Sequence, residues 1–145
     1  MSLESGGGIR KRFNHMKTIL MALLLLPVTS TAWAEWVLYG HNEKFGVYTE
    51  PATIRRSGDL VKMWNMFEFK IAQVAADGKA YWSAKTYNEY DCKDEHTRSL
   101  FFSWHSGKRG DGATVYSHDG PPSNWRPISP RSVDETLWKI ACGKN

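Results

Sequence analysis

The sequence lacks an apolar run long enough to cross a membrane. Its longest such run, at residues 19–26, is far shorter than the ~20 residues that a membrane-spanning helix needs. The sequence also lacks a cysteine directly after the small-residue triplet Ala32-Trp33-Ala34. Without that cysteine there is no acceptor for a lipid anchor at this position. We therefore expect no membrane anchor once the segment before residue 35 is removed.

That first segment has the three parts of a secretory signal peptide. Basic residues are concentrated in positions 10–17, the apolar run follows, and Pro27 breaks it before the small residues that end at Ala34. The pattern predicts a cleavable signal peptide in residues 1–34. An uncleaved anchor and a core helix are the alternatives.

Cleavage between Ala34 and Glu35 would leave residues 35–145 as the mature chain, in the periplasm or outside the cell. No internal repeat or long linker interrupts this part, so we expect one domain. Met1 and Met16 both fit as the start of translation, because Met16-Lys17 also makes a conventional signal start.

The mature chain has no excess of positive charge. The formal charge of the whole sequence is +4, but removing residues 1–34 leaves 15 basic and 14 acidic residues. Nucleic-acid binding requires a positive field over the protein surface. A near-neutral domain lacks that field, so nucleic acid is excluded as a partner.

Catalytic motifs are also lacking. There is no Gly-x-Ser-x-Gly nucleophile motif, and His41, His105 and His118 lie in separate segments without an adjacent carboxylate pattern. The acidic segment 91–96 holds residue types that bind metals, but its spacing matches no closed zinc site and favours a solvated turn. We therefore expect no enzyme, no metal and no cofactor.

Two loops hold candidate partner-binding residues. The glycine-rich loop at residues 107–112 contains Arg109-Gly110-Asp111, a tripeptide that animal integrins recognise, although the same residues are ordinary turn formers. Trp125 lies in a proline-rich loop, where it either packs against a helix or is exposed and anchors a partner. Arg109, Asp111 and Trp125 are thus the candidates for partner binding.

The mature chain does contain apolar runs with a period of two, separated by turn residues, which is typical of β-strands. Six runs are recognisable, at residues 36–39, 45–48, 60–70, 80–92, 97–105 and 114–116. The dipeptide Asp77-Gly78 predicts a hairpin between two of them, and residues 120–123 are expected to end the sheet. The alternation places Trp82, Ala84 and Tyr90 on one face of their strand.

The last segment changes to a helical period. Ser132 and Glu135 fit a capping box, apolar residues recur at helical spacing through Ala141, and Gly143 is a good helix end. The pattern therefore predicts one C-terminal amphipathic helix and an α+β fold.

The two cysteines, Cys92 and Cys142, both lie in the mature chain. In an oxidising compartment such a pair indicates a disulfide, which here would hold the helix against the inner face of the sheet. Two free thiols, or half of a metal site, are the alternatives.

Several segments resemble a known family in the same order along the chain, both cysteines included. They are residues 36–38, 48–59, 61–64, 83–87, 90–92, 115–117, 125–128 and 141–144. These segments resemble the surface-adhesin protein E family of Gram-negative bacteria. The resemblance implies an antiparallel sheet of about six strands with one C-terminal helix packed on it and tied by a disulfide.

The resemblance also implies protein partners. The family's namesake is an outer-membrane lipoprotein that binds host matrix and serum proteins such as vitronectin, laminin and plasminogen, whereas this sequence lacks the lipidated cysteine. We expect an exported, non-enzymatic, adhesin-like domain that binds a host matrix protein or a bacterial envelope protein. The alternative is a periplasmic accessory or inhibitor protein that acts on an envelope partner. The ligand and the oligomeric state stay open.

Overall fold

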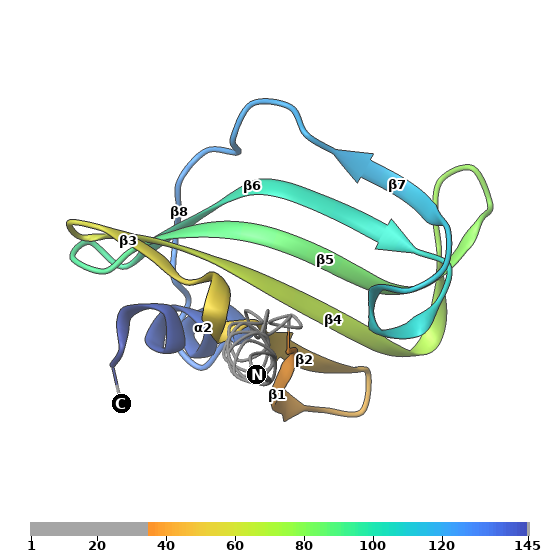
Figure 1. Ribbon diagram of the computed structural model, residues 1–145, viewed down its shortest axis with the longest axis horizontal. Coiled ribbons are helices and arrows are strands. Elements are labelled where there is room, and N and C mark those ends of the chain that lie inside the picture. Colours follow the sequence, from red (N-terminus) through yellow and green to blue (C-terminus); the bar gives the residue numbers. More distant parts are fainter. Residues whose placement is uncertain (1–34, 145) are drawn as a thin grey trace, which may run out of the picture. The chain divides into compact units, whose positions relative to one another are not determined.

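An antiparallel β-sheet forms the body of the computed structural model, which describes residues 35–144 (Figure 1). Six strands lie in the order β1-β2-β4-β5-β6-β7, while the short strands β3 and β8 pair with β4 and β6. The strands are β1 (Val37–His41), β2 (Phe45–Thr49), β3 (Arg55–Ser57), β4 (Leu60–Val74), β5 (Ala80–Asp91), β6 (His96–His105), β7 (Thr114–His118) and β8 (Arg126–Pro127). The predicted antiparallel sheet of about six strands is confirmed.

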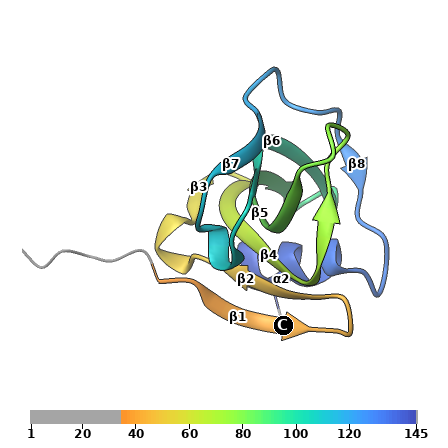
Figure 2. The same ribbon diagram turned by 90° about the vertical axis from the view of Figure 1, so that its right-hand side faces the viewer.

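The C-terminal helix α2 (Val133–Cys142) covers part of one face of this sheet, at the end where β4 begins (Figures 1 and 2). The Ser132 hydroxyl accepts a hydrogen bond from the backbone N–H of Glu135 at 3.1 Å, and Gly143 ends the helix with a φ of 64°. The predicted capping box is only half formed, because the Glu135 carboxylate accepts from the N–H of Arg131 instead of Ser132. The helix itself is confirmed.

The hydrophobic core lies between α2 and the sheet. Its buried residues are Val47, Val61, Met63, Tyr90, Cys92, Leu137, Trp138 and Ala141. The strand residues in this set alternate along their strands, and the helix residues recur at helical spacing, because each element turns one face to the other. Burying a large apolar side chain of this kind contributes about 1.5–3 kcal/mol.

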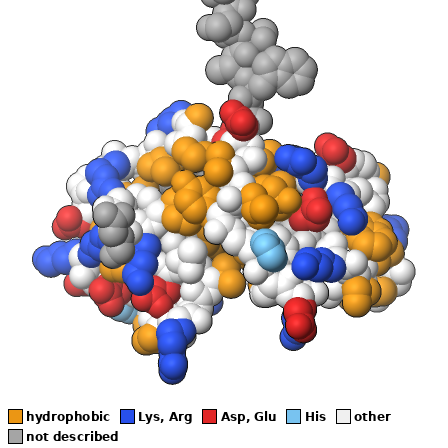
Figure 3. Space-filling model, turned by 90° about the horizontal axis from the view of Figure 1, so that it is seen from below, with side chains coloured by type: hydrophobic (Ala, Val, Ile, Leu, Met, Phe, Trp, Pro, Cys, Tyr) orange, Lys and Arg blue, Asp and Glu red, His pale blue; other side chains and the backbone are white. Residues whose placement is uncertain are grey.

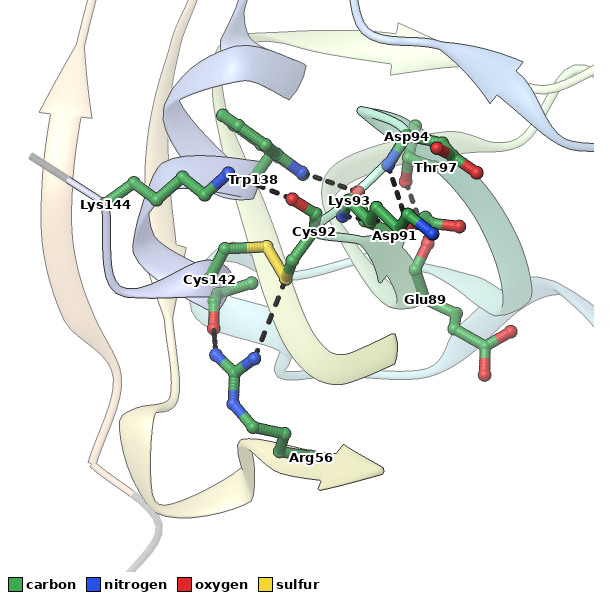
Figure 4. Close-up of a disulfide and its surroundings, with 11 residues drawn as sticks. Arg56, Glu89, Asp91, Cys92, Lys93, Asp94, Thr97, Trp138, Cys142 and Lys144 are labelled. Carbon is green, nitrogen blue, oxygen red and sulfur yellow. Dashed lines mark hydrogen bonds between the residues drawn. A yellow bond between two sulfur atoms is a disulfide. The ribbon is translucent and has the colours of Figure 1, made fainter. Parts of the chain in front are cut away.

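The predicted disulfide joins Cys92 to Cys142 and ties the end of α2 to the turn after β5 (Figure 4). Two hydrogen bonds close the same corner. The indole N–H of Trp138 donates to the carbonyl oxygen of Asp91 at 2.8 Å, and Lys144 Nζ donates to that of Cys92 at 2.9 Å. The helix is therefore held at this end by a covalent bond and by two polar contacts.

The other face of the sheet is partly covered by the loop of residues 106–113, which contains the short 3-10 helix η2 (Lys108–Gly110). The Ser83 hydroxyl on β5 fixes this loop by donating to the carbonyl oxygen of Gly107 at 2.6 Å and accepting from the N–H of Gly110 at 2.8 Å. On β6, the Ser103 hydroxyl shares a hydrogen bond of 2.8 Å with Nε2 of His105, and both side chains are buried. A small domain is thus packed on both faces of its central strands.

Two predictions from simple patterns are wrong. Residues 120–123 do not end the sheet, because Arg126 and Pro127 pair with β6; proline is compatible with the edge of a sheet, where its missing N–H is not needed. The alternation fails at Trp82, because the register between β4 and β5 shifts after Glu68. The Trp82 ring lies beside Lys108 of η2, with 5.4 Å between Nζ and the ring centroid.

Removing the disulfide should lower stability strongly. The double variant Cys92→Ala/Cys142→Ala opens the covalent loop between two residues that are 50 positions apart. The unfolded chain then gains conformational entropy, and the free energy of unfolding should fall by about 4 kcal/mol. Urea unfolding followed by tryptophan fluorescence measures this loss. The wild-type protein in reductant should lose a similar amount, whereas two alkylatable thiols in the native oxidised protein would contradict the disulfide.

Stability should also fall in mild acid because of His105. Burial, and then the positive charge of Lys85, lower the pKa of His105, while the Asp111 carboxylate raises it. The folded protein therefore binds this proton less readily than the unfolded chain, whose histidine pKa is about 6.5. The stability that comes from keeping His105 neutral is complete above pH 6.5. It is lost as the pH falls through the pKa of His105 in the folded protein.

The variant His105→Gln should show a smaller decrease in unfolding free energy between pH 7.5 and pH 5 than the wild type. Denaturant unfolding at a series of pH values measures the difference. His118→Gln, which replaces an exposed histidine, is the comparison variant for the loss of one imidazole. Equal slopes in the wild type and His105→Gln would show that His105 does not carry the effect.

Candidate protein-binding surface

Aromatic side chains from four neighbouring strands contact one another on the half of the sheet that lies away from α2. Their cluster consists of Phe69, Tyr81, Phe102, Trp104, Tyr116 and His118. The rings of Tyr81 and Trp104 are nearly parallel, with centroids 4.7 Å apart, and Trp104 lies 5.0 Å from Tyr116. Stacking of this kind adds about 0.5–1.5 kcal/mol per pair beyond burial.

The register of the strands creates this cluster. Phe102 lies opposite His118, and Trp104 lies opposite Tyr116, where β6 pairs with β7. Side chains that are directly opposite in an antiparallel pair are close enough to touch. Two adjacent cross-strand pairs of rings therefore form a continuous surface, and Tyr116, at 45% exposure, presents part of it to solvent.

A groove of about 480 Å³ lies between these rings and the tip of the β4–β5 hairpin. We call it the aromatic groove, and its lining residues are Ala75, Ala76, Asp77, Phe102, Trp104, Val115 and Tyr116. Most of its lining is apolar, and the hairpin tip forms one wall. A concave apolar site bounded by rigid rings is suited to hold an apolar or aromatic group from a partner.

An ion pair stands at the hairpin wall of the aromatic groove. Lys79 Nζ lies 2.8 Å from the Asp77 carboxylate, and the Lys79 backbone N–H donates to the same carboxylate at 3.2 Å. These hydrogen bonds from Lys79 lower the pKa of Asp77. The carboxylate is therefore ionised and paired at neutral pH, and it closes one end of an otherwise apolar surface.

The tripeptide Arg109-Gly110-Asp111 belongs to the loop that is fixed on the opposite face of the sheet. Arg109 has a positive φ of 57°, and its guanidinium lies 5.7 Å from the ring centroid of Tyr48. Gly110 has a φ of 74°, and a Cβ at this position would collide with the Lys85 side chain. The tripeptide is held by these contacts, while the side chains of Arg109 and Asp111 stay exposed.

Trp125 stacks on Arg98 of β6, whose guanidinium carbon lies 4.5 Å from the indole centroid. Arg98 Nε also donates to the Glu89 carboxylate at 2.6 Å, and Lys62 lies 3.8 Å from the same carboxylate. Lys62, Glu89 and Arg98 are neighbours across β4, β5 and β6. Trp125, at 37% exposure, therefore lies on Arg98 at one end of a row of alternating charges.

Strand β1 presents a second apolar surface. Val37, Leu38 and Tyr39 are all exposed, Tyr39 to 45%, and β1 pairs with β2 alone within the described part of the chain. Figure 3 shows hydrophobic side chains gathered on this face, next to the point where the described chain begins. An edge strand with exposed apolar residues is a common site of pairing with another chain.

The acidic segment at residues 91–96 forms a tight turn between β5 and β6. The Asp91 carboxylate accepts hydrogen bonds from the backbone N–H groups of Lys93 and Asp94, both at 2.9 Å (Figure 4). The bond from Asp94 is the main cause that lowers the pKa of Asp91. In residues 35–144 no group of three or more histidine, cysteine or acidic side chains is arranged to hold a metal ion.

The structure does not bring the predicted candidate residues together. Arg109 and Asp111 lie on the loop over one face of the sheet, whereas Trp125 stacks on Arg98. Sequence reasoning proposed binding residues only in two loops and so missed the aromatic groove on the sheet. The signal in the sequence was the concentration of large rings in β6 and β7, namely Phe102, Trp104 and Tyr116.

Within residues 35–144 no helix is both long enough and apolar enough to span a bilayer. The predicted signal peptide in residues 1–34 lies outside the described residues, and cleavage between Ala34 and Glu35 stays a prediction.

Comparison with known proteins gives one consistent result. The family model described as surface-adhesin protein E matches residues 36–143. Crystal form II of Haemophilus influenzae protein E is 13% identical to the chain, with a TM-score of 0.61, over 82% of this chain and 94% of that one. A further structure of Haemophilus influenzae protein E is 14% identical, with a TM-score of 0.59, over 82% and 91%. A sequence search of curated proteins finds no match.

At these identities the structural likeness shows the fold, and the family model shows the relationship along the sequence. The matched residues include every strand, the helix and both cysteines of the disulfide. The chain belongs to the surface-adhesin protein E family.

Proposed function

We propose that residues 35–145 are a single, exported, non-enzymatic domain that binds another protein through the aromatic groove. The aromatic groove is the observation that carries the proposal, and membership of an adhesin family supports the class of function. The partner would insert an apolar or aromatic side chain between the rings of β6 and β7 and the tip of the β4–β5 hairpin. A host matrix protein or a protein of the bacterial envelope fits this description.

Three properties of the aromatic groove suit a protein partner. Large aromatic side chains contribute much contact area and lose little conformational entropy on binding. Trp104, which lines the groove, is stacked on Tyr81 behind it, and a ring held in place before the partner arrives lowers the cost of association. The Asp77–Lys79 ion pair adds a polar rim, and interfaces typically combine an apolar centre with such a rim.

The proposed binding depends on aromatic contacts and not on the net charge of the domain. The mature chain has 15 basic and 14 acidic residues, so its net charge supplies little long-range attraction. Affinity would instead come from a few buried aromatic contacts, as at most interface hot spots. We therefore expect binding that depends weakly on salt.

Truncation at the aromatic groove should weaken binding at least tenfold. The purified mature domain would be tested by surface plasmon resonance against immobilised vitronectin, laminin and plasminogen. Tyr116→Ala removes an exposed ring of the groove, and a loss of about 1.4 kcal/mol or more corresponds to that tenfold change. Ala76→Arg, on the opposite wall, should block the groove and give a similar loss.

Tyr39→Ala is the matched control, because Tyr39 and Tyr116 are both 45% exposed on strands at opposite edges of the sheet. It should bind like the wild type. A loss at Tyr39→Ala with none at Tyr116→Ala would move the site to β1. Arg109, Asp111 and Trp125 stay predicted partner residues, and Asp111→Glu and Trp125→Ala test them in the same assay.

Export should leave a mature chain that begins at Glu35. N-terminal sequencing of the protein recovered from cells checks the cleavage, and an N-terminus upstream of residue 34 would contradict it. Protease treatment of intact cells then separates the two compartments. Digestion on intact cells, or recovery in the medium, supports a host partner, whereas protection until the outer membrane is opened supports an envelope partner.

A further inference from the structure

Three buried polar atoms lie in one row across the centre of the sheet without a hydrogen-bond partner among the described residues. They are the hydroxyl oxygens of Thr49 and Thr86 and the amide oxygen of Asn65. Thr49 on β2 lies directly opposite Asn65 on β4, and Asn65 lies directly opposite Thr86 on β5. Thr49 and Asn65 are completely buried. Unpaired buried polar atoms are rare in native proteins, so three in one row call for an explanation.

Asn65 turns its amide nitrogen toward a neighbouring tyrosine. Asn65 Nδ2 donates to the hydroxyl oxygen of Tyr90 at 2.9 Å, and Asn88 Nδ2 donates to the same oxygen at 3.4 Å. Tyr90 is itself fully buried in the core, and burial raises its pKa, so the hydroxyl stays protonated. Because the amide nitrogen is engaged by Tyr90, the amide oxygen of Asn65 is left to find another donor.

The strand geometry sets the size of the gaps in this row. Side chains that are directly opposite in an antiparallel sheet have Cβ atoms roughly 5 Å apart. The polar atoms of these opposite side chains do not hydrogen-bond each other directly, and a water molecule that makes two hydrogen bonds of about 2.8 Å can link such a pair. Thr49 and Thr86 are two strand spacings apart, about 10 Å, so one water cannot reach both. An amide oxygen has two lone pairs and can accept from two waters.

We infer that the row binds two internal water molecules, one linking Asn65 Oδ1 to the Thr49 hydroxyl and one linking it to the Thr86 hydroxyl. These waters satisfy all three atoms and join β2, β4 and β5 beneath the core. Internal waters of this kind typically make about three hydrogen bonds to buried polar groups that have no other partner. The row thus becomes a hydrogen-bonded chain that runs across three strands from Thr49 to Thr86.

The sign of a stability change tests this inference. Thr49→Val and Thr86→Val replace each hydroxyl by a methyl group of nearly the same shape. If a water binds there, each variant leaves that water, or the Asn65 oxygen, without one of its hydrogen-bond partners. The urea concentration at the unfolding midpoint then falls. If the hydroxyls are truly unpaired, their removal relieves a buried polar group, and the midpoint rises. A rise or no change in both variants would overturn the inference.

Two further threonines serve as matched controls. Thr97 is buried and its hydroxyl donates to the carbonyl oxygen of Glu89 at 3.2 Å, so Thr97→Val shows the fall that follows loss of a direct hydrogen bond. Thr114 is exposed at the start of β7, so Thr114→Val shows the effect of the valine substitution alone. Thr49→Val and Thr86→Val should resemble Thr97→Val.

A crystal structure at high resolution gives a direct reading. In the wild type, ordered waters should lie within hydrogen-bond distance of Asn65 Oδ1 and of each threonine hydroxyl. In Thr49→Val the water between β2 and β4 should disappear while the one between β4 and β5 stays. Direct contact between the threonine and asparagine side chains, with no water in the row, would overturn the inference even if the midpoints fall.

Discussion

The packing of this domain depends on a mismatch in length between its only described α-helix and the sheet. Helix α2 has ten residues, about 15 Å, whereas strand β4 has fifteen residues, about 50 Å when extended. The helix therefore covers the part of one sheet face that holds Val61, Met63 and Tyr90, and within residues 35–144 no second α-helix covers the rest of that face. Apolar burial there has to come from side chains packing on one another.

The aromatic residues resolve this mismatch. Rings on β4, β5, β6 and β7 pack edge to face, face to face and at intermediate tilts on the part of the sheet that lies away from α2. Each ring hides part of its neighbour from water, so the cluster is partly buried without a covering element. The same arrangement leaves the outer faces of some rings open to solvent. The aromatic groove is thus a consequence of a short helix on a long sheet, and the proposed binding function uses a surface that the architecture already provides.

Much of the fold could be predicted from the sequence. The period-two runs, the Asp77-Gly78 hairpin, the helical spacing near Ala141 and the cysteine pair each depend on local rules that hold in the structure. The short strand β8 was not predicted, because it has two residues and forms by pairing with β6 and not through a pattern of its own. Trp82 was misplaced because a register shift in β4 is a tertiary event that no alternation records.

The candidate site was harder to predict than the fold. Phe102 and Trp104 alternate as core residues do, and only the lengths of the assembled elements show that α2, the α-helix within residues 35–144, does not cover them. The side chains of Arg109 and Asp111 are exposed, but the backbone of their loop is hydrogen-bonded to Ser83 on the sheet, which the glycine-rich pattern does not predict. The row of Thr49, Asn65 and Thr86 is invisible in a linear sequence, because its members are neighbours only through strand pairing.

One wall of the aromatic groove is a hairpin tip, and this has a consequence for how such a domain can change. Residues 75–79 join two strands beyond the register shift, away from the helix and from the disulfide. Loops of this kind accept substitutions and changes of length at little cost to the rest of the fold. The shape of the groove can therefore vary while the core and the covalent link stay the same. Under the proposed function, part of the partner selectivity would then lie in this hairpin, whereas the stability of the fold depends on the core and the disulfide.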